Sequence, residues 1–200
     1  MLGEKTSLAQ KQAALHILVD VVEFGSEGSH PLISNVALAC IQFSGHPNST
    51  VRRAACYGLA VCAQHGASQV TSVLPQALAG LHSAAKRDRV NDADSADDDD
   101  FDAARDNAVD AVGRICRYHS SCGQIDAAAV LGEWAAWMPC PADEECNASA
   151  TDFLACLLEG TPGALAGLRP ALREAAGRAA ALGSTPAPTR ARLEAVLASP

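Results

Sequence analysis

The sequence predicts an all-α protein in which antiparallel helix pairs stack into a solenoid. Of its 200 residues, 48% are hydrophobic but only 4% are aromatic, and the abundant Ala and Leu are good helix formers. Few segments show the alternation of β-branched and polar residues that is typical of strands. A helix-start pattern also occurs twice, and self-similarity at long spacing indicates a helical repeat protein. We therefore expect four or five helix pairs of about 40 residues each.

The repeated pattern is a polar turn, an Arg, and then small residues at helical spacing. Its first copy covers residues 46–61, and a looser second copy covers residues 101–115. A Gly follows the Arg in both copies, six residues later in the first and eight residues later in the second. Small residues let two helices approach closely, so we expect the pattern to hold neighbouring helices together. Its structural positions are Val51, Arg52, Gly58, Arg105 and Gly113.

The individual helices follow from apolar periodicity and from their start and stop signals. They are expected at residues 7–24, 32–43, 49–64, 68–85, 102–118, 125–138, 143–159, 162–182 and 189–198. Ser49 is the expected N-cap of the third helix and Gly66 its C-cap. Pro75 is expected to kink the fourth helix, and Pro170 to divide the helix at 162–182 into two pieces.

An acidic segment interrupts the helices. Seven Asp residues lie within eleven positions: Asp92, Asp94, Asp97, Asp98, Asp99, Asp100 and Asp102. Removing their charges from the formal net charge of −8 leaves −1, which argues against binding to nucleic acid phosphates. Because like charges repel and apolar anchors are lacking, we expect residues 87–101 to form a mobile loop between helical repeats at 1–86 and 102–200. The loop is either a solvated surface or an electrostatic capture site for a basic partner.

The sequence contains no recognisable catalytic or metal-binding motif. The eight cysteines include no C-x-x-C pair, and no His pair joins them at zinc spacing. Cys40, Cys56, Cys62 and Cys156 fall in apolar helical stretches, which favours free thiols over disulfides. There is no nucleophile elbow, P-loop or H-E-x-x-H motif, and the longest apolar runs are too short to span a bilayer. We therefore expect no enzyme, metal, cofactor or membrane insertion.

The first copy of the pattern resembles the second helix of a HEAT repeat, which opens with a turn, then Val-Arg, small residues and a Gly. Three further blocks resemble, in the same order, C-terminal repeats of the importin-beta superfamily in its beta-three branch (importins four and five). These blocks cover residues 19–24, 106–115 and 133–139, and the resemblance extends over roughly residues 12–160. In its second copy Ala104-Arg105 replaces Val-Arg.

This resemblance implies a HEAT-repeat α-solenoid, a right-handed superhelix of antiparallel helix pairs. The first helix is then the second member of a truncated repeat, and the other eight form four consecutive pairs. Arg52 and Arg105 are expected to reach a turn carbonyl or carboxylate of the adjacent repeat.

The function that the resemblance implies is nuclear import of proteins. Second helices would line the concave face and bind basic cargo with nuclear localisation signals, and grooves between first helices would take nucleoporin Phe-Gly repeats. Ran GTPase would bind N-terminal repeats that this chain lacks, so we expect a fragment of a receptor that moves between cytoplasm and nucleus through the pore. The candidate cargo-binding residues are Asp97, Asp98, Asp99, Asp100, Asp106, Asn107 and Asp110. The alternative is a HEAT-repeat scaffold subunit of a multiprotein complex with no transport role.

Overall fold

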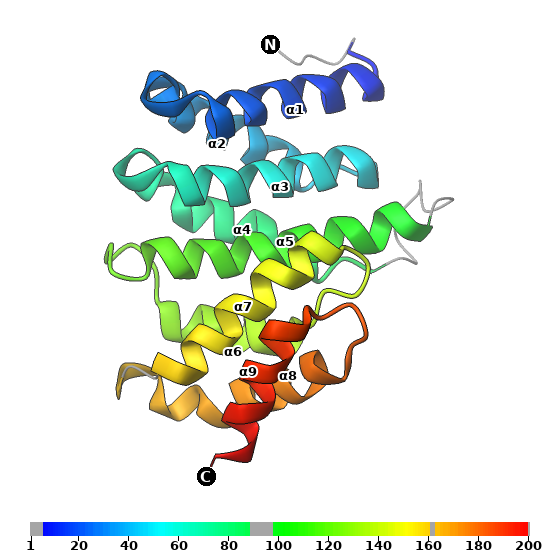
Figure 1. Cartoon of the computed structure of the whole chain (residues 1–200). Coiled ribbons are helices and arrows are strands. Elements are labelled where there is room, and N and C mark those ends of the chain that lie inside the picture. The colour runs from blue at the N-terminus through cyan, green and yellow to red at the C-terminus, as the bar shows by residue number, and fades with distance from the viewer. Residues whose placement is uncertain (1–5, 89–97, 161–162, 200) are drawn as a thin grey trace.

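The computed structural model describes residues 6–88, 98–160 and 163–199, and these residues fold into nine α-helices with no strand (Figure 1). The all-α prediction is therefore confirmed. The helices are α1 (Leu8–Phe24), α2 (His30–Ser44), α3 (Ser49–His65), α4 (Leu74–Ala85), α5 (Asp98–His119), α6 (Ala127–Trp137), α7 (Glu144–Gly160), α8 (Arg169–Ala181) and α9 (Ala187–Ala198). Among the described residues, no helix combines the length and the apolar character that crossing a membrane requires.

The helices lie in two rows that run from the N-terminal to the C-terminal end of the molecule (Figure 1). In one row α1, α3, α5, α7 and α9 contact one another in succession, and in the other α2 contacts α4 and α6 contacts α8. Between the rows α2 packs on α3, α4 on α5, and α8 on α9, which are three of the four expected pairs. The fourth pair, α6 and α7, meets through the rings of Trp134 and Phe153, whose centroids are 5.6 Å apart. Helix α7 crosses α5 obliquely (Figure 1).

The N-cap of α3 and the start of α4 differ from the sequence-based expectation. The N-cap of α3 is Asn48 rather than Ser49, because the Asn48 carboxamide oxygen accepts a hydrogen bond from the Val51 amide at 3.1 Å. Pro75 does not kink a long helix but stands in the first turn of α4, behind two short 3₁₀ turns at 67–69 and 71–73. Proline suits a first helical turn, where its missing N–H has no partner to lose. The expected division at Pro170 is present, since α8 begins at Arg169 behind a 3₁₀ segment.

Helix α5 begins inside the acidic segment. It starts at Asp98, so residues 98–101 are helical and the expectation of a loop through residue 101 is wrong for them. Acidic side chains favour the positive end of the helix dipole. Phe101 also anchors this turn, because its ring is 5% exposed and lies 5.5 Å from the guanidinium of Arg52. Residues 89–97, which make up most of the expected loop, lie outside the described residues, so its mobility stays a prediction.

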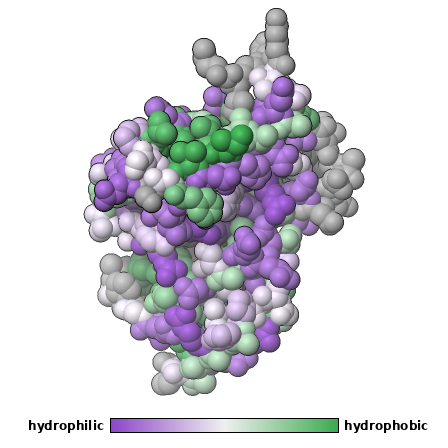
Figure 2. Space-filling model, turned by 45° about the horizontal axis from the view of Figure 1, so that its top comes forward, coloured by the Kyte–Doolittle hydropathy of each residue, from purple (hydrophilic) through white to green (hydrophobic). Residues whose placement is uncertain are grey.

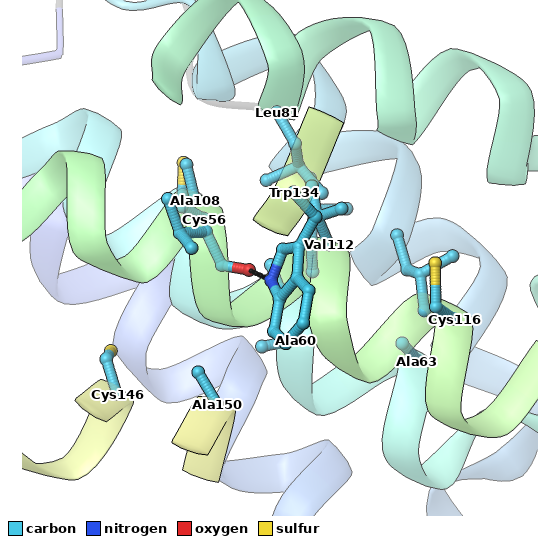
Figure 3. Close-up of a cluster of buried hydrophobic side chains, with 14 of the residues drawn as sticks. Cys56, Ala60, Ala63, Leu81, Ala108, Val112, Cys116, Trp134, Cys146 and Ala150 are labelled. Atoms are coloured by element: carbon cyan, nitrogen blue, oxygen red, sulfur yellow. Dashed lines mark hydrogen bonds between the residues drawn. The ribbon is translucent and has the colours of Figure 1, made fainter. Parts of the chain in front are cut away.

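Small side chains fill the space between the rows. A Cβ on Gly58 would overlap the sulfur of Cys40 and lie 2.8 Å from Val19 Cγ2, so α1, α2 and α3 meet at a point where only a glycine fits. Farther along, the buried Trp134 is surrounded by Ala, Val and Cys side chains of α3 and α5 (Figure 3). Its indole N–H donates to the Val109 carbonyl at 2.9 Å. A Cβ on Gly113 would stand 3.2 Å from the same indole ring.

One end of the molecule exposes apolar side chains. Six large ones are exposed on α1 and α2: Leu8, Ile17, Val21, Phe24, Leu32 and Leu38. Figure 2 turns this end toward the viewer and shows an apolar patch among hydrophilic neighbours. Among the described helices, α3, α5 and α7 each pack against two neighbours within their row, whereas α1 is the first of the row and packs within it against α3. The outer surface of α1 and α2 is therefore left exposed.

Candidate functional site

A polar groove of about 390 Å³ opens on the row that contains α1, α3, α5 and α7. Each of the four helices or the residue just before it contributes to the lining: Gln12, His16, Thr50, Arg53, Ala54, Tyr57, Asp100, Asn107, Arg114, Asp143, Glu145 and Cys146. Three carboxylates, those of Asp100, Asp143 and Glu145, stand against the two guanidinium groups of Arg53 and Arg114. The groove is therefore polar, with a small excess of negative charge.

Arg53 lies at the centre of this charge arrangement. Its Nη2 is 2.9 Å from Asp143 Oδ2, and its Nη1 is 3.5 Å from Asp100 Oδ1. The Arg53 side chain is 43% exposed, whereas that of Asp143 is 11% exposed. One guanidinium from α3 thus bridges a carboxylate at the start of α5 and another just before α7.

Asp143 is fixed in place by groups other than Arg53. Its Oδ1 accepts a hydrogen bond from the Cys146 amide at 3.1 Å, in the manner of an N-cap for α7. Its Oδ2 also accepts from Asn107 Nδ2 at 3.0 Å. Burial raises the pKa of Asp143, but these hydrogen bonds and the Arg53 charge outweigh burial and hold the pKa below its usual value. Asp143 therefore stays ionised at neutral pH.

Two of the predicted cargo-binding carboxylates are in the interior. Asp106 is 0% exposed and accepts hydrogen bonds from the Ala142 and Asp143 amides at 2.6 and 3.2 Å. Asp110 is 2% exposed and lies 2.9 Å from Arg114 Nε. Burial raises the pKa of each to about 6, against the opposing effects of their hydrogen bonds and nearby arginines. Neither carboxylate is available to a partner at the surface, which corrects that expectation.

The other predicted cargo-binding residues differ in whether they line the groove and in what they bind there. Asn107 lines the groove, but its amide is used by the Ala103 carbonyl at 2.9 Å and by Asp143. Asp100 also lines the groove, and its Oδ2 accepts from Thr50 Oγ1 at 2.9 Å. Asp97 lies outside the described residues, as do the side chains of Asp98 and Asp99. Among the side chains of the acidic run that the structure describes, Asp100 brings a carboxylate to the groove.

The repeat arginines bind turn carbonyls. Arg52 is 1% exposed, and its Nη1 donates to the carbonyls of His46 and Pro47 at 2.7 and 2.9 Å. These carbonyls belong to the turn just before its own helix, and the guanidinium also lies 5.5 Å from the centroid of the Phe101 ring on α5, the second helix of the next pair. Arg105 reaches the next pair, because its Nη2 donates to the Trp137 carbonyl at the end of α6 at 2.6 Å.

A second, more apolar groove of about 170 Å³ lies on the opposite row, between α4 and α6. Its apolar lining comes from Leu78, Val112, Ala129, Val130 and Trp137. His82 Nδ1 stands 2.9 Å from Glu133 Oε2 at its rim, and Lys86 Nζ lies 3.6 Å from the same oxygen. Lys86 also lies 5.9 Å from the centroid of the Trp137 ring. The groove combines an aromatic wall with a charged edge.

Sequence reasoning missed the central groups of the polar groove. Arg53 and Asp143 are 90 positions apart, and nothing in the local pattern of either predicts that they meet. Cys146 also lines the groove, but burial raises its pKa, so it stays a neutral thiol. In the described part of the chain no three His, Cys, Asp or Glu side chains are grouped so as to hold a metal ion.

Comparison with known protein families does not assign the chain to a family. No protein-family model matches the chain. Its relation to the importin-beta superfamily therefore rests on the residues of the four sequence blocks and is a proposal.

Proposed function

We propose that the chain is a right-handed HEAT-repeat α-solenoid from a nuclear import receptor of the importin-beta superfamily, and that its polar groove binds basic segments of cargo proteins. The four collinear sequence blocks support the family, and the two rows of paired helices are compatible with a solenoid. The observation that carries the binding function is the lining of the groove, in which three carboxylates gather in one concavity.

The groove suits a cationic side chain for physical reasons. It is partly screened from bulk water, so each charge there acts more strongly than at an open surface. Its α3–α5–α7 side already holds one guanidinium between two carboxylates, which is the geometry that an arginine of a partner would use. Glu145 is exposed at the start of α7 and would meet an incoming charge first. Attraction of this kind weakens as salt rises.

The apolar groove between α4 and α6 is the corresponding proposal for nucleoporin Phe-Gly repeats. Trp137 offers a ring for edge or offset packing, and Leu78 and Val130 supply the apolar walls. The two grooves lie on opposite rows of helices, so a receptor could hold cargo and nucleoporin together. This arrangement fits Ran-dependent transport between cytoplasm and nucleus through the pore of the nuclear envelope.

The test is fluorescence anisotropy of a labelled Lys/Arg-rich nuclear localisation peptide, titrated with the chain at low and at physiological salt. We expect saturable binding that weakens as salt rises, and a loss of about tenfold in affinity in the double variant Asp100→Asn/Glu145→Gln, since each removed charge is worth roughly threefold in a partly exposed site. The matched control is the double variant Glu174→Gln/Glu194→Gln on α8 and α9, which also removes two negative charges but outside the groove.

The two negative outcomes have different meanings. Absence of binding at low salt would overturn the cargo function and favour the scaffold subunit. Binding that the double variant and the control weaken equally would show attraction to overall charge instead of a site in the groove.

A further inference from the structure

We infer that Arg53 is an internal competitor for the basic side chain that the groove binds, so that the groove is occupied by the chain's own guanidinium until cargo displaces it. This inference rests on the proposed function and adds a regulatory contact to it. The observation behind it is the bridge from Arg53 to Asp143 and Asp100, at 2.9 and 3.5 Å.

The carboxylates keep their positions without Arg53. Asp143 is held by the Cys146 amide and by the Asn107 side chain, and Asp100 accepts from the Thr50 hydroxyl. If Arg53 swings away, the acceptors therefore remain in place for another cation. A site that needed Arg53 for its own assembly would not behave in this way.

Arg53 can leave the bridge at a small cost. Its side chain is 43% exposed, and ion pairs at such positions contribute little net stability. The neighbouring pair Arg114–Asp110 differs, because Asp110 is 2% exposed and would be left as a buried, unpaired charge. Arg53 is thus the exchangeable cation of the groove, and Arg114 is the fixed one.

Removal of Arg53 also changes the field in the groove. With Arg53 in place, the groove lining holds three carboxylates and two guanidinium groups, and without it Arg114 is the remaining guanidinium of the lining. Arg114 is itself paired with Asp110 and donates to Gln64 at 2.8 Å, so it is not directed at the three carboxylates. An incoming cation would meet a larger negative charge and would have no competitor for the carboxylates.

The experiment compares the wild type with Arg53→Gln in the same anisotropy titration with the Lys/Arg-rich peptide. We expect Arg53→Gln to bind the peptide about threefold to tenfold more tightly at low salt, the effect of one unit charge a few ångströms away in a partly hydrated site. Arg117→Gln is the matched control: Arg117 is 36% exposed, pairs with Asp152 at 3.0 Å, and does not line the groove. Because both variants lose one positive charge, a gain confined to Arg53→Gln identifies local competition.

A second variant separates competition from a change in folding. In Arg53→Gln/Asp100→Asn the gain should largely disappear, because one of the freed acceptors is removed as well. Unchanged or weaker binding by Arg53→Gln, with binding by the wild type, would overturn the inference and leave the proposed function standing. Failure of both proteins to bind would overturn both. Tighter binding by Arg117→Gln of the same size would assign the effect to net charge and would also overturn it.

Discussion

The glycine at position 58 offers a quantitative test of how closely the helices pack. We consider Gly58→Ala, which adds one methyl group where α1, α2 and α3 meet. The new Cβ would overlap the Cys40 sulfur and lie 2.8 Å from Val19 Cγ2, and both neighbours are almost completely buried. The exchange gains about 1 kcal/mol of helix propensity but forces an overpacked core that typically costs 1–3 kcal/mol, here at the upper end of about 3 because two helices must shift. We expect a net loss of about 2 kcal/mol.

The matched control is Gly177→Ala on α8. A Cβ there meets nothing within 4 Å, so the propensity gain stands alone and the variant should be more stable by about 0.5–1 kcal/mol. Thermal unfolding followed by circular dichroism at 222 nm would measure both, with about 2–4 °C expected per kcal/mol for a chain of this size. The added change Cys40→Ala should restore part of the stability lost in Gly58→Ala, which double-mutant analysis would quantify.

The outcome that would refute this reasoning is a stabilised Gly58→Ala variant, with the same sign of change as Gly177→Ala. It would mean that the first three helices are not held at the spacing that the structure gives. A loss of stability in Gly58→Ala that Cys40→Ala makes worse would locate the strain elsewhere in the core.

Two further predictions concern the carboxylates of Asp110 and Asp143. Burial raises the pKa of Asp110 from 3.8 to about 6, so the folded state holds this proton more tightly than the unfolded state, and the contribution of the group to stability falls as pH rises from about 4 to about 6. Urea unfolding should therefore show the stability of Asp110→Asn relative to wild type rising by up to about 3 kcal/mol between pH 4 and pH 7; a difference that does not change with pH would contradict the assignment. Asp143→Ala should lose about 2–3 kcal/mol, since it removes the N-cap of α7 and leaves the buried Asn107 amide short of a partner. Asp143→Asn, which can still cap, should lose less than half of that, and equal losses in the two variants would argue against the cap.

The sequence predicts the helices well because each is determined by its own residues. Apolar periodicity locates all nine helices, seven of them within four residues of their observed bounds. Helix α4 begins six residues later than expected, and α8 begins seven residues into its expected range, next to the Pro170 that was expected to divide it. Their ends are less certain because neighbouring residues compete for the same role. Asn48 and Ser49 are both good caps, and Pro75 is equally consistent with a kink and with a first turn. The start of α5 depends on a contact across the molecule, that of Phe101 with Arg52, and such a contact has no local signal.

The candidate site is less predictable for the same reason. The charge run suggested a site on the acidic segment, and among its described side chains that of Asp100 reaches the groove. Asp106 and Asp110 have the same residue type and lie on the same helix, but the face on which they lie is covered by the residues around the start of α7 and by Arg114. Which acidic side chains become structural and which stay accessible is decided by how the helices stack, and this information is distributed over the whole chain.

The many buried thiols allow local unfolding of the protein to be measured by cysteine alkylation. All eight cysteines are free, and six of them are buried. Burial raises the pKa of Cys56, Cys62 and Cys116 to about 12, so these three thiols form almost no reactive thiolate in the folded protein. Alkylation of each buried thiol must then wait for local unfolding of its own helix, and its rate reports the free energy of that opening. Because buried cysteines occur on α2, α3, α5 and α7, the chain carries natural probes along most of its length, and their order of reaction would show at which end it begins to come apart.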